Sequence, residues 1–205
     1  MKYQKIAIYS IRIIFGIWSI LELIQLEWVN VAVLLAGLIL SFVPECYTKC
    51  TKIHIPVGAS LFLSVFLFGS QFLGSYLGAY TYLSWWDIML HLVSGIMVGY
   101  SGLVLLVTFD KSQILFERKK YFLIAFIIFT TAVTGAVFWE IIEFTGDTFF
   151  GTNAQLGSLR DTMEDLICGT IVGGGFAFYI WLDLYYQKYK SCVNSLLSIN
   201  KYRAK

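Results

Sequence analysis

Apolar residues occur along this chain in blocks of roughly twenty residues, separated by short polar stretches. A helix of about twenty apolar residues crosses the ~30 Å hydrocarbon core of a bilayer. The blocks predict six membrane-spanning helices, over residues 6–24, 28–43, 56–74, 85–108, 121–144 and 163–186. None alternates with the period of two that transmembrane β-strands need. We therefore expect an all-α polytopic transmembrane bundle, with residues 1–205 as a single integral membrane domain.

The composition agrees with this pattern and excludes several classes of protein. Hydrophobic residues make up 58% of the chain, charged residues only 14%, and the mean hydropathy is +0.73. Soluble domains carry about 25% charged residues. A soluble enzyme, a secreted disulfide scaffold and a nucleic-acid binder are therefore excluded. The expected partner is membrane lipid, and the oligomeric state stays open.

The basic residues indicate how the spans are oriented, since cytoplasmic loops of membrane proteins are enriched in Lys and Arg. Six spans with both termini in the cytoplasm place fourteen of the fifteen basic residues on one side, and only Arg160 on the other. Arg12 lies inside the first span, from which its side chain is expected to snorkel back to the interface. We predict a multi-pass cell-membrane protein with cytoplasmic amino and carboxyl termini.

The acidic residues follow a different distribution and gather at the opposite, exterior ends of the last three spans. The three groups are Asp87 with His91, then Glu140, Glu143 and Asp147, then Asp161, Glu164 and Asp165. Residues three or four apart share one face of a helix. The topology brings all three helix ends to the same membrane face. We expect His91, Glu140, Glu143 and Asp165 to form one layer just below the exterior headgroups.

So many carboxylates in one place need compensation, because two like charges about 4 Å apart repel by about 4 kcal/mol at an effective dielectric near 20. Protonation, a basic side chain or a bound metal would provide it, and Arg160 is the only basic residue nearby. A metal site or a proton-carrying site remains. The candidate ligands are His91, Glu140, Glu143, Asp161, Asp165 and Asp87, of which Asp87 could instead orient the imidazole. Glu143 or His91 is the candidate general base, and mixed O and N ligands suit Zn²⁺, Mn²⁺ or Mg²⁺ equally.

Three stretches carry a family resemblance. WWDIMLHLVSG (Trp85–Gly95), WEIIEFTGDTFFGTN (Trp139–Asn153) and DTMEDLICGTIVG (Asp161–Gly173) resemble the YjdF-like family of uncharacterised bacterial membrane proteins. The match extends over the last three spans, with the family's order and spacing. The resemblance implies a multi-spanning protein of a bacterial inner membrane, and it implies no particular reaction.

Three functions fit this pattern. The first is a metal-dependent hydrolase or transferase acting on a lipid or lipid-linked substrate near the outer leaflet. The others are a proton-coupled or cation transporter, and a non-catalytic membrane protein with a structural ion. Transporter sites usually lie near the midplane in repeated halves, whereas this cluster lies near one face. We expect a one-sided pocket, closed below His91 by Phe138, Ile141 and Val172.

The topology can be tested by thiol labelling in intact cells. We expect a membrane-impermeant maleimide to leave Cys46, Cys50 and Cys192 unmodified, and to label a cysteine introduced by Asn153→Cys. The physical reason is the side of the membrane that each loop occupies. Labelling of the native cysteines without labelling of position 153 would invert the topology and move the acidic cluster to the cytoplasmic face.

Overall fold

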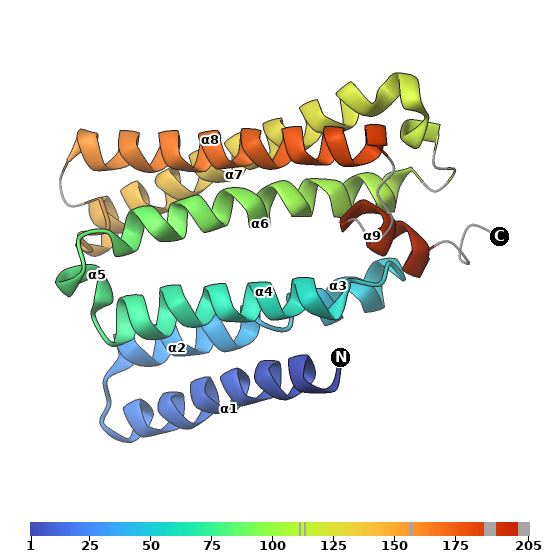
Figure 1. Cartoon of the computed structure of the whole chain (residues 1–205). Coiled ribbons are helices and arrows are strands. Elements are labelled where there is room, and N and C mark those ends of the chain that lie inside the picture. Colours follow the sequence, from blue (N-terminus) through green and yellow to red (C-terminus); the bar gives the residue numbers. More distant parts are fainter. Residues whose placement is uncertain (111, 113, 156–157, 187–191, 201–205) are drawn as a thin grey trace. The chain divides into compact units, whose positions relative to one another are not determined.

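A computed structural model describes residues 1–110, 112, 114–155, 158–186 and 192–200 of the chain. These residues form helices joined by short turns, without a β-strand among them. The chain divides into two compact units, Met1–Trp86 and Asp87–Lys205 (Figure 1). The first unit contains α1 (Lys2–Ile24), α2 (Trp28–Leu40), α3 (Val43–Thr51), α4 (Val57–Leu67), the π-helix η1 (Phe68–Tyr76) and α5 (Ala79–Tyr82). The second contains α6 (Trp86–Phe109), the 3₁₀ turns η2 (Ile114–Phe116) and η3 (Arg118–Lys120), α7 (Tyr121–Phe150), α8 (Leu159–Tyr186) and α9 (Cys192–Asn200).

Five helical segments among the described residues are long and apolar enough to cross a membrane, and the bent pair α2 and α3 makes a sixth if counted as one span. The predicted all-helical, multi-pass architecture is confirmed at this level. The side of the membrane on which the termini lie and the single-domain organisation stay predictions. Lys111 and the basic residues after Tyr186, on which the orientation partly rests, lie outside the described residues.

The first unit is built around aromatic packing. α1 packs against both α2 and α4, and α2 packs against η1. Phe15, Leu34 and Phe72 form its buried core, and the Phe15 ring meets the Phe72 ring edge to face, with centroids 6.1 Å apart. A Cβ atom on Gly37 would lie 2.6 Å from the Phe15 ring. A glycine at this position is therefore what lets the ring lie against α2.

The third span continues α4 as a π-helix, in which amides bond to carbonyls five residues earlier. The Leu77 amide donates to the Phe72 carbonyl at 2.9 Å in this register. At its end, Tyr76 donates its hydroxyl hydrogen to Oε1 of buried Glu22 at 2.7 Å, and Asn30 donates to Oε2 at 2.9 Å. Both oxygens of this buried carboxylate are therefore satisfied from other helices.

The predicted second span, residues 28–43, is interrupted in the structure. α2 ends at Leu40, and α3 starts at Val43 after a bend of 41°. Pro44 lies in the first turn of α3, where the missing N–H costs nothing. In a continuous helix the same proline would remove a hydrogen bond and clash with the preceding turn. The apolar length of this block predicted a crossing, and the proline decides where it bends.

The side chain of Arg12, inside the first candidate span, has several partners within the protein. Its side chain is buried and bonds to the Ser41 hydroxyl oxygen at 3.0 Å, the Ser41 carbonyl at 2.5 Å and Glu45 Oε1 at 2.8 Å. Its guanidinium also lies 3.9 Å from the centroid of the Phe42 ring. The break after α2 frees the Ser41 carbonyl and brings Glu45 within reach, so Arg12 finds these partners inside the protein.

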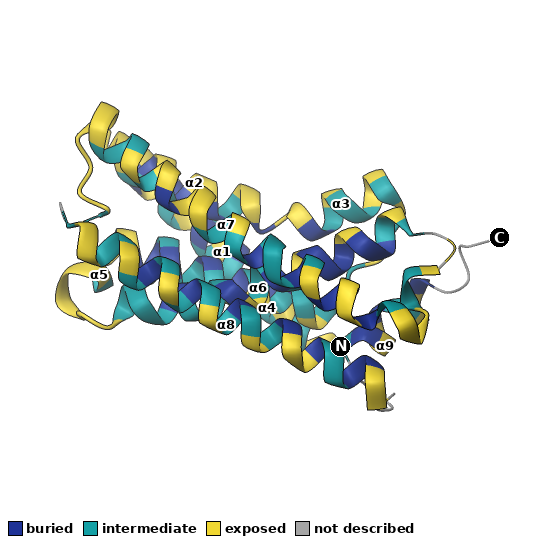
Figure 2. Cartoon of the chain, turned by 90° about the horizontal axis from the view of Figure 1, so that it is seen from above, coloured by how far each residue is buried: buried dark blue, intermediate teal, exposed yellow. Residues whose placement is uncertain are grey.

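In the second unit, α6, α7 and α8 approach one another closely along small residues. A Cβ atom on Gly95 of α6 would lie 2.7 Å from the Gly169 carbonyl oxygen of α8. One on Gly169 would lie 3.3 Å from Cβ of Ala136 in α7, and one on Gly173 would lie 2.5 Å from Cβ of Ala132. The small residues at four-residue spacing therefore let the backbones meet. Along α6, α7 and α8, buried positions alternate with exposed ones (Figure 2).

The helix α7 extends beyond the predicted end of its span. We expected a loop from Thr145 to Arg160, but the helix runs on through Gly146 to Phe150. Gly151 ends it with φ of +67°, a conformation that glycine adopts without strain. Glu140 therefore lies about 15 Å before the helix end, not about 7 Å. The expected unfavourable interaction of Glu140 and Glu143 with a helix carboxyl terminus was wrong.

The helix α9, which sequence reasoning did not predict, packs against α8. Burial raises the pKa of the Cys192 thiol to about 11, and the nearby carboxylate of Asp183 adds to this. A thiol with so high a pKa reacts slowly near neutral pH on either side of a membrane, because the thiolate is the nucleophile. Among the native cysteines, the labelling test of the topology therefore depends on the exposed thiols of Cys46 and Cys50.

Gly95→Ala should destabilise the second unit, because the new methyl group would collide with backbone. Overpacking of this kind costs about 1–3 kcal/mol, and we expect a lower midpoint of thermal unfolding in detergent. Gly175→Ala on α8 is the matched control, since a Cβ there meets nothing within 4 Å and gains the same helix propensity. Equal midpoints for the two variants would contradict the close approach of α6 and α8.

Candidate functional site

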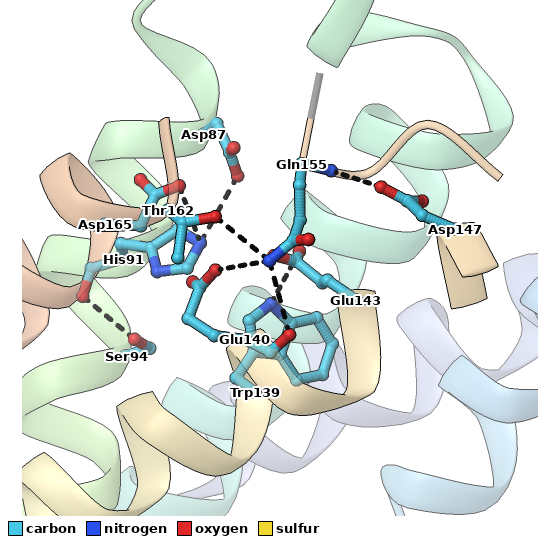
Figure 3. A network of polar contacts seen from close by, with 10 residues as sticks. All are labelled: Asp87, His91, Ser94, Trp139, Glu140, Glu143, Asp147, Gln155, Thr162 and Asp165. Atoms are coloured by element: carbon cyan, nitrogen blue, oxygen red, sulfur yellow. Dashed lines mark hydrogen bonds and ion pairs between the residues drawn. The ribbon is translucent and has the colours of Figure 1, made fainter. Parts of the chain in front are cut away.

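The candidate site is a layer of ionisable side chains one helical turn away from the small-residue junction. His91 precedes Gly95 by four residues, Asp165 precedes Gly169 by four, and Glu140 follows Ala136 by four on the antiparallel helix. Residues four apart share a helix face. The faces that meet at the junction therefore also carry these three buried side chains toward one another (Figure 3).

His91 is the centre of this layer. Its Nε2 lies 3.5 Å from Asp87 Oδ1 on the same helix and 3.9 Å from Asp165 Oδ2 on α8. One ligand atom each from Asp87, His91 and Asp165 lie within 4.8 Å of one another. One ligand atom each from His91, Glu140 and Glu143 also lie within 4.8 Å of one another and form a second group. The imidazole of His91 therefore lies close to carboxylates from α6, α7 and α8.

The two glutamates of α7 differ in their surroundings. Glu143 is half-buried and accepts a hydrogen bond on Oε1 from the Trp139 indole N–H at 2.8 Å. Glu140 is only 6% exposed, and its Oε2 lies 3.4 Å from the Gln155 side-chain nitrogen. The other Glu140 oxygen, Oε1, is buried without a hydrogen-bond partner. A buried acceptor left unpaired costs about 1–3 kcal/mol or more for a charged group.

Gln155 holds the segment after α7 over the cluster. Its side-chain nitrogen, Nε2, donates to Thr162 Oγ1 at 3.0 Å. The same nitrogen lies 3.4 Å from both the backbone carbonyl oxygen and Oε2 of Glu140. One amide group thus joins the segment before α8, the first turns of α8 and the middle of α7 (Figure 3). The Gln155 side chain therefore covers Glu140 on the side of the segment between α7 and α8.

Asp147 fixes the position of Gln155. Its Oδ1 accepts from Thr152 Oγ1 at 2.5 Å and from the Ala154 amide at 2.7 Å, and its Oδ2 accepts from the Gln155 amide at 3.0 Å. Hydrogen bonds to a charged carboxylate are stronger than those between neutral groups. A residue of the last turn of α7 therefore organises the backbone that presents the Gln155 side chain.

A cavity of about 440 Å³ lies beside this segment, outside the buried cluster. It is lined by Phe144, Asp147, Thr148, Gln155, Ser158, Leu159 and Thr162. Gln155 and Thr162 belong both to its wall and to the hydrogen-bond network of Glu140. These two side chains therefore separate the cavity from the buried carboxylate.

The structure brings together five of the six predicted ligand residues, namely Asp87, His91, Glu140, Glu143 and Asp165. Among the described residues, neither of the two groups of ligand atoms includes Asp161, although it lies in the first turn of α8. Glu164 pairs instead with Arg160, whose Nε donates to Glu164 Oε1 at 2.6 Å. Asp147 organises the adjoining segment.

The cluster receives no basic partner within the described part of the chain. Arg160, the expected source of compensation, is exposed and pairs with Glu164. The described ion pairs of the cluster involve only the imidazole of His91. Metal–ligand bonds of about 2.0–2.6 Å allow two ligands of one ion to lie up to about 5 Å apart. Ligand atoms within 4.8 Å of one another, a mixture of N and O donors and the unpaired Glu140 Oε1 would therefore suit a divalent metal ion.

The apolar floor differs from the prediction. Phe138 is 63% exposed and Ile141 is 53% exposed, so both face outward from α7. The exposed positions follow from the helix period, because Phe138 and Ile141 flank Glu140 and point to the other side of α7. The layer beneath the cluster consists instead of Gly95, Ala136 and Gly169.

Sequence reasoning did not find Gln155, Thr162 or Trp139. All three are uncharged, and two contribute through contacts that join distant segments. Trp139 could have been found, since it lies four residues before Glu143 on the same helix. Gln155 depends on the path of the chain between α7 and α8, which residue periodicity does not describe.

Comparison with known proteins gives a family and one relative. The family model described as "Predicted membrane protein (DUF2238)" matches residues 5–188. An uncharacterized protein of Thermotoga maritima is 35% identical over 127 residues, which is 62% of this chain. The chain covers 63% of that relative's length. No solved structure matches.

Asp147→Ala should release the segment that presents Gln155. Losing hydrogen bonds to a charged group costs about 1.5–3 kcal/mol each, so the Ala154 and Gln155 amides should exchange hydrogen roughly ten- to a hundredfold faster. Hydrogen exchange measured by mass spectrometry checks this. Thr148→Ala, an exposed neighbour on the same turn, is the control and should leave exchange unchanged. Unchanged protection in Asp147→Ala would show that other contacts hold the segment.

Proposed function

The chain belongs to the DUF2238 family of predicted membrane proteins, and we propose that it is a metal-dependent membrane enzyme, a hydrolase or transferase acting on a lipid or lipid-linked substrate. One observation carries this proposal. A buried carboxylate oxygen, Glu140 Oε1, has no hydrogen-bond donor although it lies among four other ionisable side chains from three helices. An acceptor so enclosed needs a cation or a proton.

Asp87, His91 and Asp165, whose ligand atoms form one group, would hold a divalent ion, and Glu140, grouped with His91 and Glu143, would complete the set. They supply one nitrogen and three carboxylates, and three of the four are buried. Such an ion, when bound, lowers the pKa of a coordinated water or alcohol and polarises a phosphoryl or carbonyl oxygen. The donor set suits Zn²⁺, Mn²⁺ and Mg²⁺.

Glu143 is the best candidate for the general base. It is less buried than Glu140, and the Trp139 indole N–H fixes one of its oxygens. The other oxygen is then oriented to accept a proton from a water or alcohol at the cluster. His91 remains a ligand in this arrangement, because it belongs to both groups of ligand atoms.

Packing below the cluster favours an enzyme over a carrier. The hydroxyls of Ser94, Ser101 and Thr131 donate to carbonyls of their own helices, so they do not form a chain leading away from His91. Gly95 and Gly169 meet at backbone distance just beneath. A transported ion needs oxygen ligands that replace its hydration shell along its path. The tightly packed glycine junction offers few such ligands.

The cluster is further proposed to face the exterior of a bacterial inner membrane, with both termini in the cytoplasm. The distribution of basic residues supports this orientation. The resemblance of Trp85–Gly95 and Trp139–Asn153 to the YjdF-like family supports the location. A substrate would approach from the level of the headgroups, through the cavity beside Gln155.

The metal proposal can be tested on purified protein. We expect a stoichiometric divalent ion in the detergent-purified chain by elemental analysis, and at least a tenfold loss of it in Glu140→Gln. Removing one carboxylate from a buried site lowers both charge and ligand number. Glu164→Gln is the matched control, because Glu164 lies at the same end of the unit but pairs with Arg160. Equal metal content in the two variants would contradict the proposed metal site.

Turnover and transport can then be distinguished with the same variants. Mass spectrometry of a bacterial lipid extract, incubated in mixed micelles with the metal-loaded protein, should show conversion of a lipid species. Glu143→Gln should abolish this conversion while keeping its metal, as expected of a base. Cation flux into liposomes that is lost in Glu140→Gln, without any lipid conversion, would favour a carrier.

A further inference from the structure

The first unit contains a cavity of about 350 Å³ at the end where α1 and α4 begin. Lys5 of the first turn of α1, Lys49 of α3 and Val57 of the first turn of α4 all line it. The remaining lining residues are Ile8, Tyr9, Pro44, Glu45, Thr48, Ile55 and Ser60. All belong to residues 5–60, so the cavity is formed by the first unit alone.

The charge in this cavity is positive. Lys5 and Lys49 are exposed, and neither forms an ion pair with another described residue. Glu45, the one acidic lining residue, bonds to the guanidinium of buried Arg12 at 2.8 Å. Its negative charge is thus offset within the protein. Two uncompensated ammonium groups remain, beside the hydroxyls of Tyr9 and Thr48.

The position of the cavity matches the level of lipid headgroups. Lys5 and Val57 lie in the first turns of two candidate spans. The helix α3, bent by 41° from α2, carries the polar residues Glu45, Thr48 and Lys49. Apolar side chains of Ile8, Ile55 and Val57 line the same space. Ammonium groups next to apolar walls at the end of a span suit an amphipathic anion.

We propose that this cavity binds the phosphate of an anionic phospholipid headgroup between Lys5 and Lys49. Basic pockets between transmembrane helices bind such headgroups. The hydroxyls of Tyr9 and Thr48 supply further donors to phosphate oxygens, and Ile8 and Val57 lie along the start of the acyl chains. The proposal is independent of the metal-dependent function, since it uses no residue of the acidic cluster.

Native mass spectrometry of the full chain in detergent, titrated with phosphatidylglycerol, tests this site. Each Lys near an anionic lipid contributes about 1 kcal/mol, so Lys5→Gln with Lys49→Gln should weaken binding roughly thirtyfold. The control removes two charges elsewhere, by Lys2→Gln with Lys119→Gln, and should bind as the unmodified chain does. Both substituted lysines of the cavity are exposed, and circular dichroism should verify that the helices form.

Three results would overturn the proposal. Equal weakening in the control variant would mean non-specific attraction to the total charge. Equal affinity for phosphatidylcholine would mean that the two lysines do not select the headgroup. Saturable binding of inorganic phosphate that displaces the lipid in the low millimolar range would assign the cavity to a soluble phosphate compound. Selective binding of phosphatidylglycerol that depends on Lys5 and Lys49 supports the lipid site.

Discussion

The close approach of α6 and α8 at Gly95 and Gly169 determines the arrangement of the second unit. Without side chains between them, the two backbones come so near that a single Cβ atom would lie 2.7 Å from a carbonyl oxygen. Residues one turn away must then meet at short range, and these residues are His91 and Asp165. The same helical period on α7 places Glu140 above Ala136. The acidic cluster is thus a geometric consequence of the small residues beneath it.

Two buried glutamates differ in how their carboxylates are paired. Glu22 and Glu140 are similarly buried, at 7% and 6% exposure. Both oxygens of Glu22 accept hydrogen bonds from neighbouring helices, whereas Glu140 retains one oxygen without a donor. Buried polar groups in native proteins are nearly always paired. The carboxylate of Glu22 needs no further partner, whereas the enclosed oxygen of Glu140 needs a cation or a proton.

The sequence predicted the spans and the convergence of the acids, because both depend on period and length. Apolar length identified the helices to within a few residues at most ends, and i, i+4 spacing placed Asp87 beside His91. The predictions of helix ends failed where single residues determine the backbone path. Pro44 set the bend after α2, and Gly151 set the end of α7. The partners of Arg12, Ser41 and Glu45, could not be predicted, because they become available only after that bend.

The polar surroundings of the site were harder to predict than its charged members. Gln155 reaches Glu140 only because Asp147 fixes the intervening backbone. Such a contact depends on the path of an irregular segment, which carries no periodic signal. The direction of Phe138 and Ile141 was instead recoverable, since the helix phase that turns Glu140 inward turns them outward.

The π-helix of the first unit has a consequence for length changes in the third span. A π-helix accommodates an additional residue relative to the α-helical register. Deleting one residue between Phe68 and Tyr76 would let the α-helical register resume while the flanking residues keep their relative direction, so the Tyr76 hydroxyl would stay near Glu22. The same deletion in the α-helical part, Val57–Leu67, would instead rotate every later residue by about 100° and carry this hydroxyl away from the carboxylate. The π-helix thus confines a change of length, and the contact it protects is with a residue more than fifty positions earlier in the chain.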